Sequence, residues 1–220
     1  YKIFNIKYEI LYNRDQIEKN CEDNYPNKYK NLKKYFSNIE DEIYYLEKSN
    51  ISTYNMISNE YILIHLDEKF NDIFNIKNQF ESSIVNFQKK INKKIILTTF
   101  NNNNDYYKNI TIDKIDFSKF SLEAIFNNKI IIIENMPINH FQNLIENSFL
   151  NISCHSGLFV HTSLALYKRT FDIINESDQK WLNSWIIPNN LYHQIYKSNN
   201  QQNFDINKIL ENIYEKQSAI

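Results

Sequence analysis

The sequence predicts an α/β fold, a Rossmann-like doubly wound parallel sheet of about five strands with flanking helices. The first observation is that five short apolar runs lack the alternation expected of a strand with one face in water. The second is that helical patterns separate these runs, as in βαβ units with right-handed crossovers. The five runs are residues 61–66, 94–99, 129–133, 151–154 and 169–174.

Apolar residues that recur every three or four positions predict the helices between and after these strands. We expect helices over residues 72–90, 138–147 and 157–167, and a last helix that Asp205 opens. Residues 27–47 form a further amphipathic pattern, and residues 49–59 are polar, as in a linker. Residues 101–109 are an asparagine-rich loop.

These patterns divide the chain into residues 1–59, an N-terminal appendage or helical linker, and residues 60–220, the Rossmann-like domain. The chain begins with Tyr1 in what reads as the middle of an element. We therefore expect it to be the C-terminal part of a longer protein.

The composition limits the kinds of partner that we expect the chain to bind. The 220 residues are 42% hydrophobic and 23% charged, with a net charge of −1 and a pI of about 6.6. No strong field favours nucleic acid, and no apolar run approaches the ~20 residues that span a bilayer. Cys21 and Cys154 lie far apart, which fits a reducing compartment. We expect a cytoplasmic protein that does not bind nucleic acid and has no transmembrane segment.

The topology itself predicts where a ligand binds. In open parallel sheets, ligands lie beyond the carboxyl ends of the strands. The loops in question follow Leu66, Thr99, Ile133, Cys154 and Ile174.

The stretch 151–166, NISCHSGLFVHTSLAL, holds the only glycine of the chain, Gly157, and reads as strand, tight turn and helix. A helix N-terminus presents unpaired N–H groups and a partial positive charge, which suit a phosphate. Glycine allows a sharp bend and the close approach of a ligand. The Ser156 hydroxyl and the Gly157 N–H are thus candidate phosphate ligands. The alternative is that Ser156 caps the helix and Gly157 is a plain turn residue.

Charged residues follow two other strands. Lys69 lies just past the first strand, where a lysine can reach a phosphate, although a solvated loop charge is the simpler interpretation. Glu134 ends the third strand and is a candidate acceptor for ribose hydroxyls, or else a loop acid. Asp67 and Glu68 form an acid–base pair, or else surface charge or helix caps.

Two histidines and a cysteine lie near the glycine. Cys154, His155 and His161 match no usual zinc spacing, so we expect no metal. A Cys154–His155 nucleophile pair is disfavoured because adjacent strand residues point to opposite faces. His155 remains a candidate catalytic residue, and His161 a supporting residue that packs or hydrogen-bonds beneath the turn.

The run from Glu134 to Ile174, ENMPINHFQNLIENSFLNISCHSGLFVHTSLALYKRTFDII, resembles the C-terminal donor-binding domain of heptosyltransferase-like glycosyltransferases, which have the GT-B fold. YILIHLDEKF fits the first strand of that domain with its phosphate-reaching lysine, here Lys69. The sequence departs from the family in two places. His155 replaces the acid of the turn, and His161 stands four residues after the glycine where the family usually has three.

The resemblance implies transfer of a sugar from a nucleotide-sugar donor to a glycan or lipid-linked glycan acceptor in cell-surface polysaccharide biosynthesis. It implies no cofactor and no bound metal, with Lys69, Ser156 and Gly157 on the diphosphate and Glu134 on the ribose. The family's catalytic base comes from the N-terminal domain, so this chain would bind donor without turnover if that domain is missing. The expected location is the cytoplasm, with peripheral association at the inner face of the membrane.

Two other functions fit the same residues. One is a nucleotide-sugar epimerase, for which His65, Asp67 and His155 are the candidate acid–base groups. The other is a non-catalytic interaction module that docks a partner through the helix at residues 27–47.

Overall fold

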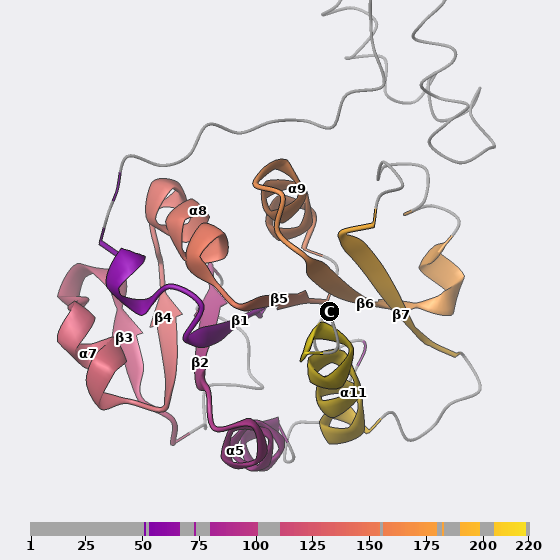
Figure 1. The fold of residues 1–220 in the computed structure, drawn as a ribbon, viewed down its shortest axis with the longest axis horizontal. Helices are drawn as coiled ribbons and strands as arrows, with labels where there is room; N and C mark the ends of the chain where they lie inside the picture. Colours follow the sequence, from indigo (N-terminus) through magenta and orange to yellow (C-terminus); the bar gives the residue numbers. More distant parts are fainter. Residues whose placement is uncertain are drawn as a thin grey trace, which may run out of the picture. The chain divides into compact units, whose positions relative to one another are not determined.

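The computed structural model describes residues 51, 53–66, 73, 80–100, 111–154, 156–179, 182, 190–198 and 205–218. These residues form an α/β, Rossmann-like fold with a seven-stranded sheet in which every pairing is parallel (Figure 1). All five predicted strands are present within a residue or so of the expected bounds. The strands are β1 (Tyr61–His65), β2 (Lys94–Thr99), β3 (Lys114–Asp116), β4 (Ile130–Glu134), β5 (Leu150–Ser153), β6 (Thr170–Asn175) and β7 (Tyr192–Lys197).

The expectation of about five strands was too low, because the sheet gains one strand at each edge, the three-residue β3 and the six-residue β7. Its order is β3-β4-β2-β1-β5-β6-β7. Without the three-residue β3, the six longer strands follow the order 3-2-1-4-5-6 in chain numbering, which is the dinucleotide-fold order. The chain reverses its winding between β1 and β5, so the topological switch point lies at the carboxyl ends of these two neighbours.

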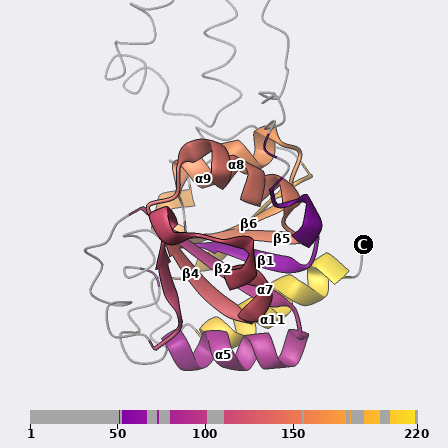
Figure 2. The same ribbon diagram turned by 90° about the vertical axis from the view of Figure 1, so that its left-hand side faces the viewer.

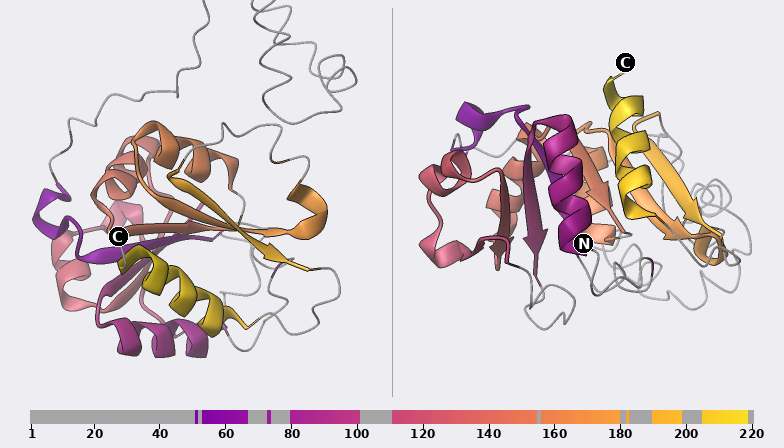
Figure 3. Two further views of the ribbon diagram at one scale, coloured as in Figure 1. Left: turned by 45° about the vertical axis from the view of Figure 1, so that its right-hand side comes forward. Right: turned by 90° about the horizontal axis from the view of Figure 1, so that it is seen from below.

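Helices cover both faces of the sheet (Figures 1 and 2). On one face, α5 and α11 lie against each other, and on the opposite face α8 packs against α9. Seen from below, α5 and α11 lie side by side in front of the sheet (Figure 3, right). The bounds are η1 (Asn55–Ile57), α5 (Phe80–Ile91), η2 (Phe117–Lys119), α7 (Leu122–Asn127), α8 (Ile138–Asn147), α9 (Gly157–Ala165), η3 (Glu176–Asp178) and α11 (Ile206–Ser218).

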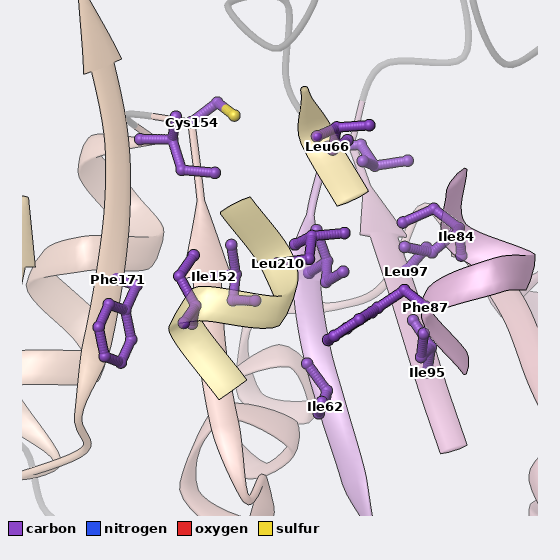
Figure 4. Close-up of a cluster of buried hydrophobic side chains, with 14 of the residues drawn as sticks. Ile62, Leu66, Ile84, Phe87, Ile95, Leu97, Ile152, Cys154, Phe171 and Leu210 are labelled. Atoms are coloured by element: carbon purple, nitrogen blue, oxygen red, sulfur yellow. The ribbon is translucent and has the colours of Figure 1, made fainter. Parts of the chain in front are cut away.

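The core on the α5/α11 face is mostly aliphatic on both the strands and the helices, with a few phenylalanines such as Phe87 and Phe171 among them (Figure 4). Leu210 of α11 and Phe87 of α5 lie over Ile62 of β1 and Ile152 of β5. Alternate residues of the same strands point to the other face. There they meet η1, α7, α8 and α9 in a second buried cluster that includes Leu63. Because both faces are buried, the strands read as continuous apolar runs.

Asparagine takes the conformation that glycine usually adopts at three turns. Asn59, Asn92 and Asn135 have φ values of 60°, 52° and 57°, and Tyr167 adopts 56° after α9. Asn92 directly follows α5 and donates its N–H to Gln88, as in a helix C-terminal cap. Asparagine tolerates this region better than most residues with a side chain. A nearly glycine-free chain therefore still forms tight turns.

The strands and α-helices belong to one compact unit formed by Tyr44–Glu176 and Asn190–Ile220. The domain boundary expected between residues 59 and 60 stays a prediction, since residues 1–50 lie outside the described part. Three predicted segments also lie outside it: the amphipathic helix at 27–47, the loop at 101–109 and much of the stretch 72–79. The helix α8 has the predicted bounds. At α11 the Asp205 carboxylate accepts N–H bonds from Asn207 and Lys208, as predicted.

Candidate functional site

The carboxyl ends of β1 and β5 meet at the switch point. Ile64 pairs with Ile152, and His65, the last residue of β1, pairs with Ser153, the last residue of β5. The chain leaves β5 through Cys154 and enters α9 at Gly157. The stretch that holds the only glycine therefore lies at the position where this class of fold binds ligands.

Among the described residues, no side chain caps the tip of α9. Ser156 is the N-cap residue, with φ −86° and ψ 108°, and its side chain makes no capping hydrogen bond. A Cβ atom built on Gly157 would have no neighbouring atom within 4 Å. Leu158, next in the first turn, is 45% exposed. The described part of the chain thus leaves room beside the Cα of Gly157 in the first turn of this helix.

The backbone conformation of Gly157 does not explain why a glycine stands here. Its φ is not positive, so it lies outside the left-handed region. The bend that glycine allows is therefore not made through a positive φ at Gly157. Neither backbone conformation nor a packed neighbour requires a glycine here, and the remaining physical reason is the space beside its Cα.

Ser153, the last residue of β5, and Cys154, which follows it, lie on opposite faces of the sheet. Cys154 is a buried free thiol in the aliphatic core of the α5/α11 face, so it cannot act as an exposed nucleophile. The Ser153 hydroxyl lies on the α9 face and donates to Asp172 Oδ1 at 2.8 Å. Asp172 is fully buried and also accepts from the Tyr192 hydroxyl at 2.7 Å. Burial, followed by the neighbouring Asp172, raises the pKa of Tyr192 well above its ordinary value, so Tyr192 stays a donor.

This buried carboxylate connects the turn before α9 to the outer strand of the sheet. Beyond Tyr192, the network continues to Gln194 at 3.2 Å and to Tyr196 at 2.5 Å from Gln194 Oε1. A buried carboxylate is costly unless hydrogen bonds satisfy it. Here two hydroxyl donors do so, which holds the end of β5 in place against β6.

His65 belongs to an aromatic cluster below the same edge. Its ring stacks parallel to Phe159 of α9, with centroids 5.5 Å apart, and contacts Phe141 of α8 and Phe100 after β2 at 5.0 and 5.2 Å. Its Nδ1 lies 3.0 Å from Thr98 Oγ1. Burial lowers the pKa of His65 to about 3, so the ring is neutral at physiological pH.

This environment removes His65 from the acid–base candidates of an epimerase. Its side chain is only 2% exposed and is enclosed by other rings, so it cannot contact a substrate. Asp67 and His155, the other two candidates, lie outside the described residues.

Glu134 lies at the same sheet edge but not beside α9. It is the last residue of β4, half-buried, between Thr99 of β2 and Asp116 of β3. Next to it, Asn135 donates to Asp116 at 2.9 Å. Hydrogen bonds from Ser118 and Asn135 lower the pKa of Asp116 to about 2. Since β2 and β1 separate β4 from β5, about 14 Å lie between the two strand ends. The ribose-binding role of Glu134 stays a prediction, and it requires a ligand that extends along the carboxyl edge of the sheet from β5 toward β4.

Of the three remaining predicted site residues, only His161 belongs to the described part of the chain. Lys69 and His155 lie outside the described part, so their roles stay predictions. His161 is exposed on α9 and does not lie buried beneath the turn. Within the described residues, no group of three or more His, Cys, Asp or Glu side chains is placed to hold a metal ion.

Sequence reasoning missed the Asp172 network and the aromatic cluster. Ser153 and Asp172 did carry a signal, because polar side chains interrupt runs that are otherwise apolar. The rings of His65, Phe100 and Phe141 come from three separate elements, and only the fold brings them together.

No protein-family model matches the sequence, and no curated protein sequence matches it significantly. Among the described residues, there is no helix with the length and apolar character needed to cross a membrane.

Proposed function

We propose that this chain is a glycosyltransferase, or the donor-binding part of one, with the GT-B fold. In this proposal, residues 60–220 bind a nucleotide sugar, and the sugar passes to a glycan or lipid-linked glycan acceptor. The single observation that carries the proposal is that no described side chain caps the tip of α9, which lies at the switch point of the sheet.

The chemistry of the leaving group fits that tip. When the bond between the sugar and the diphosphate breaks, negative charge develops on the diphosphate. Helix N-terminal amides, the Ser156 hydroxyl and a lysine are groups that stabilise such charge. We assign the amide of Gly157 and the hydroxyl of Ser156 to the phosphate, together with Lys69, which follows β1 in the chain.

The other groups divide the remaining tasks. The acceptor hydroxyl forms the new glycosidic bond and gives its proton to a base, while the nucleoside diphosphate leaves. On the resemblance to heptosyltransferase-like enzymes, that base comes from a separate N-terminal domain. Glu134 is assigned to the ribose, so its side chain would have to reach from the end of β4 across β2 toward the diphosphate. No step of this scheme requires a bound metal.

Isothermal titration calorimetry with a panel of nucleotide sugars and nucleoside diphosphates tests the proposal. The variant Ser156→Ala/Lys69→Ala should bind at least about tenfold more weakly, because each lost contact is a hydrogen bond or ion pair to a charged group. The matched control is Ser58→Ala/Lys89→Ala, which removes an exposed serine and an exposed lysine at the opposite, amino edge of the sheet. It should bind as the parent does.

Two outcomes would refute the donor site: binding of no compound in the panel, or equal affinity for the parent and the double variant. Incubation with a bound nucleotide sugar and no acceptor separates the enzyme classes. An epimerase changes the sugar, whereas a transferase at most hydrolyses it slowly.

A further inference from the structure

Phe100 is an exposed aromatic residue at the carboxyl edge of the sheet. It is the first residue after β2, and 40% of its surface is exposed. Two other large apolar side chains are exposed at the same edge. Ile138, which opens α8, is 57% exposed, and Leu158, in the first turn of α9, is 45% exposed. Exposed apolar surface beside a candidate ligand site suggests an apolar part of the ligand.

The Phe100 ring is held from below by buried rings. It meets Phe141 edge to face, with centroids 4.9 Å apart, and lies 5.2 Å from His65. Phe141 in turn lies 5.7 Å from Phe159, which stacks on His65. These three supporting side chains are almost completely buried. Because buried rings hold Phe100 in place, its side chain would lose little conformational entropy when a ligand stacks on it.

The distance from this ring to the α9 tip suits one class of ligand. The strands β2, β1 and β5 are neighbours, so the ends of β2 and β5 lie about 10 Å apart. A nucleoside diphosphate has about eight covalent bonds between its outer phosphorus and its base, which span roughly 10 Å when extended. A phosphate beside Gly157 therefore brings a base to the vicinity of Phe100.

We propose that Phe100 stacks on the nucleobase of the ligand, so that the site selects nucleoside diphosphates over pyrophosphate and sugar phosphates. The inference rests on the proposed function and adds a residue and a selectivity to it. Every base has a flat π-face, so stacking on phenylalanine favours the presence of a base more than its identity. Phe100 is then a binding residue with no part in bond breaking.

The test compares ligands with and without a base on the full chain. Titration calorimetry measures uridine, adenosine and guanosine diphosphates and inorganic pyrophosphate. Phe100→Ala should weaken the tightest nucleoside diphosphate by about tenfold or more and leave pyrophosphate unchanged. Phe100→Tyr should restore the affinity, whereas Phe100→Leu, which is apolar but has no ring, should not. If the alanine variant does not fold, the comparison of Phe100→Tyr with Phe100→Leu still tests the stacking role.

Phe126→Ala is the matched control. Phe126 is 41% exposed and lies in α7, where its carbonyl accepts from Lys94 at the amino end of β2. This variant removes an equally exposed ring from the opposite edge and should leave every affinity unchanged.

Each other outcome overturns the inference in a recognisable way. If Phe100→Ala weakens all ligands equally, or none, Phe100 does not stack on a base. If pyrophosphate binds and no nucleoside diphosphate binds more tightly, the phosphate site of the proposed function stands without a base site. If no probe binds at all, the proposed function fails, and the stacking role fails with it.

Discussion

Replacement of the only glycine by alanine should make the protein more stable and its ligand site weaker. Gly157 is the first residue of α9, its φ is not in the left-handed region, and a Cβ there would meet no atom within 4 Å. The folded protein therefore accepts an alanine without strain. In the unfolded chain, alanine has fewer backbone conformations to lose than glycine.

The gain in stability follows from this entropy. A glycine-to-alanine change at a compatible position adds about 0.4–1 kcal/mol to the free energy of unfolding. For a chain of this length, that corresponds to a rise in Tm of roughly 1–4 °C. Thermal unfolding followed by circular dichroism measures the shift.

The same methyl group should lower affinity. It occupies the space through which a phosphate oxygen would approach the first amides of α9. Calorimetry should show weaker binding of nucleoside diphosphate and of pyrophosphate to Gly157→Ala, and weaker binding still to Gly157→Leu. A lower Tm for the alanine variant would refute the backbone argument. Unchanged affinity in both variants would refute the approach of a ligand to Gly157.

Three further predictions concern the core. Asp172→Ala leaves the buried Ser153 hydroxyl and the part-buried Tyr192 hydroxyl without their acceptor and should lower the free energy of unfolding in urea by about 2–4 kcal/mol; a loss under 1 kcal/mol would contradict the network. The low pKa of His65, about 3, means that the unfolded chain takes up a proton first as the pH falls below 6.5, so stability should decrease from there by up to ~1.4 kcal/mol per pH unit. Urea unfolding of His65→Phe should show a shallower acid dependence than the parent, and an equal slope would contradict the neutral ring. Phe87→Ala removes a 1% exposed ring that contacts Tyr214 and should cost about 3–5 kcal/mol in the same assay.

The central part of the fold could be predicted because its physical signal is local. Strands such as β1 and β2 are buried on both faces, so their apolar runs are visible in the sequence. The two missed strands lie at the edges. β7, YHQIYK, is half-buried along almost its whole length and carries polar side chains, and β3 has only three residues. Neither strand has the continuous apolar run that makes the central strands recognisable.

The short helix α7 was also missed, although the sequence carries a signal for it. Ser121 precedes LEAIFN, and its side chain accepts the Ala124 N–H, as an N-cap residue does. Of the candidate site, the sequence predicted the turn into α9 at the sheet edge, but Gly157 does not have the positive φ by which glycine makes a sharp bend. The ring contacts of Phe100 depend on β2, α8 and β1 at once, so only coordinates reveal them.

The central place of β1 has a consequence for how the protein acquires its site. Ile62 pairs with Ile95 on one side and with the distant Leu150 on the other. The pairing of β1 with β5 thus forms only after two remote parts of the chain have met, which is a slow kind of contact to form. If the proposed ligand binds there, a newly made chain would gain affinity for it late in folding. The time at which ligand binding appears during refolding would then report when the sheet is complete.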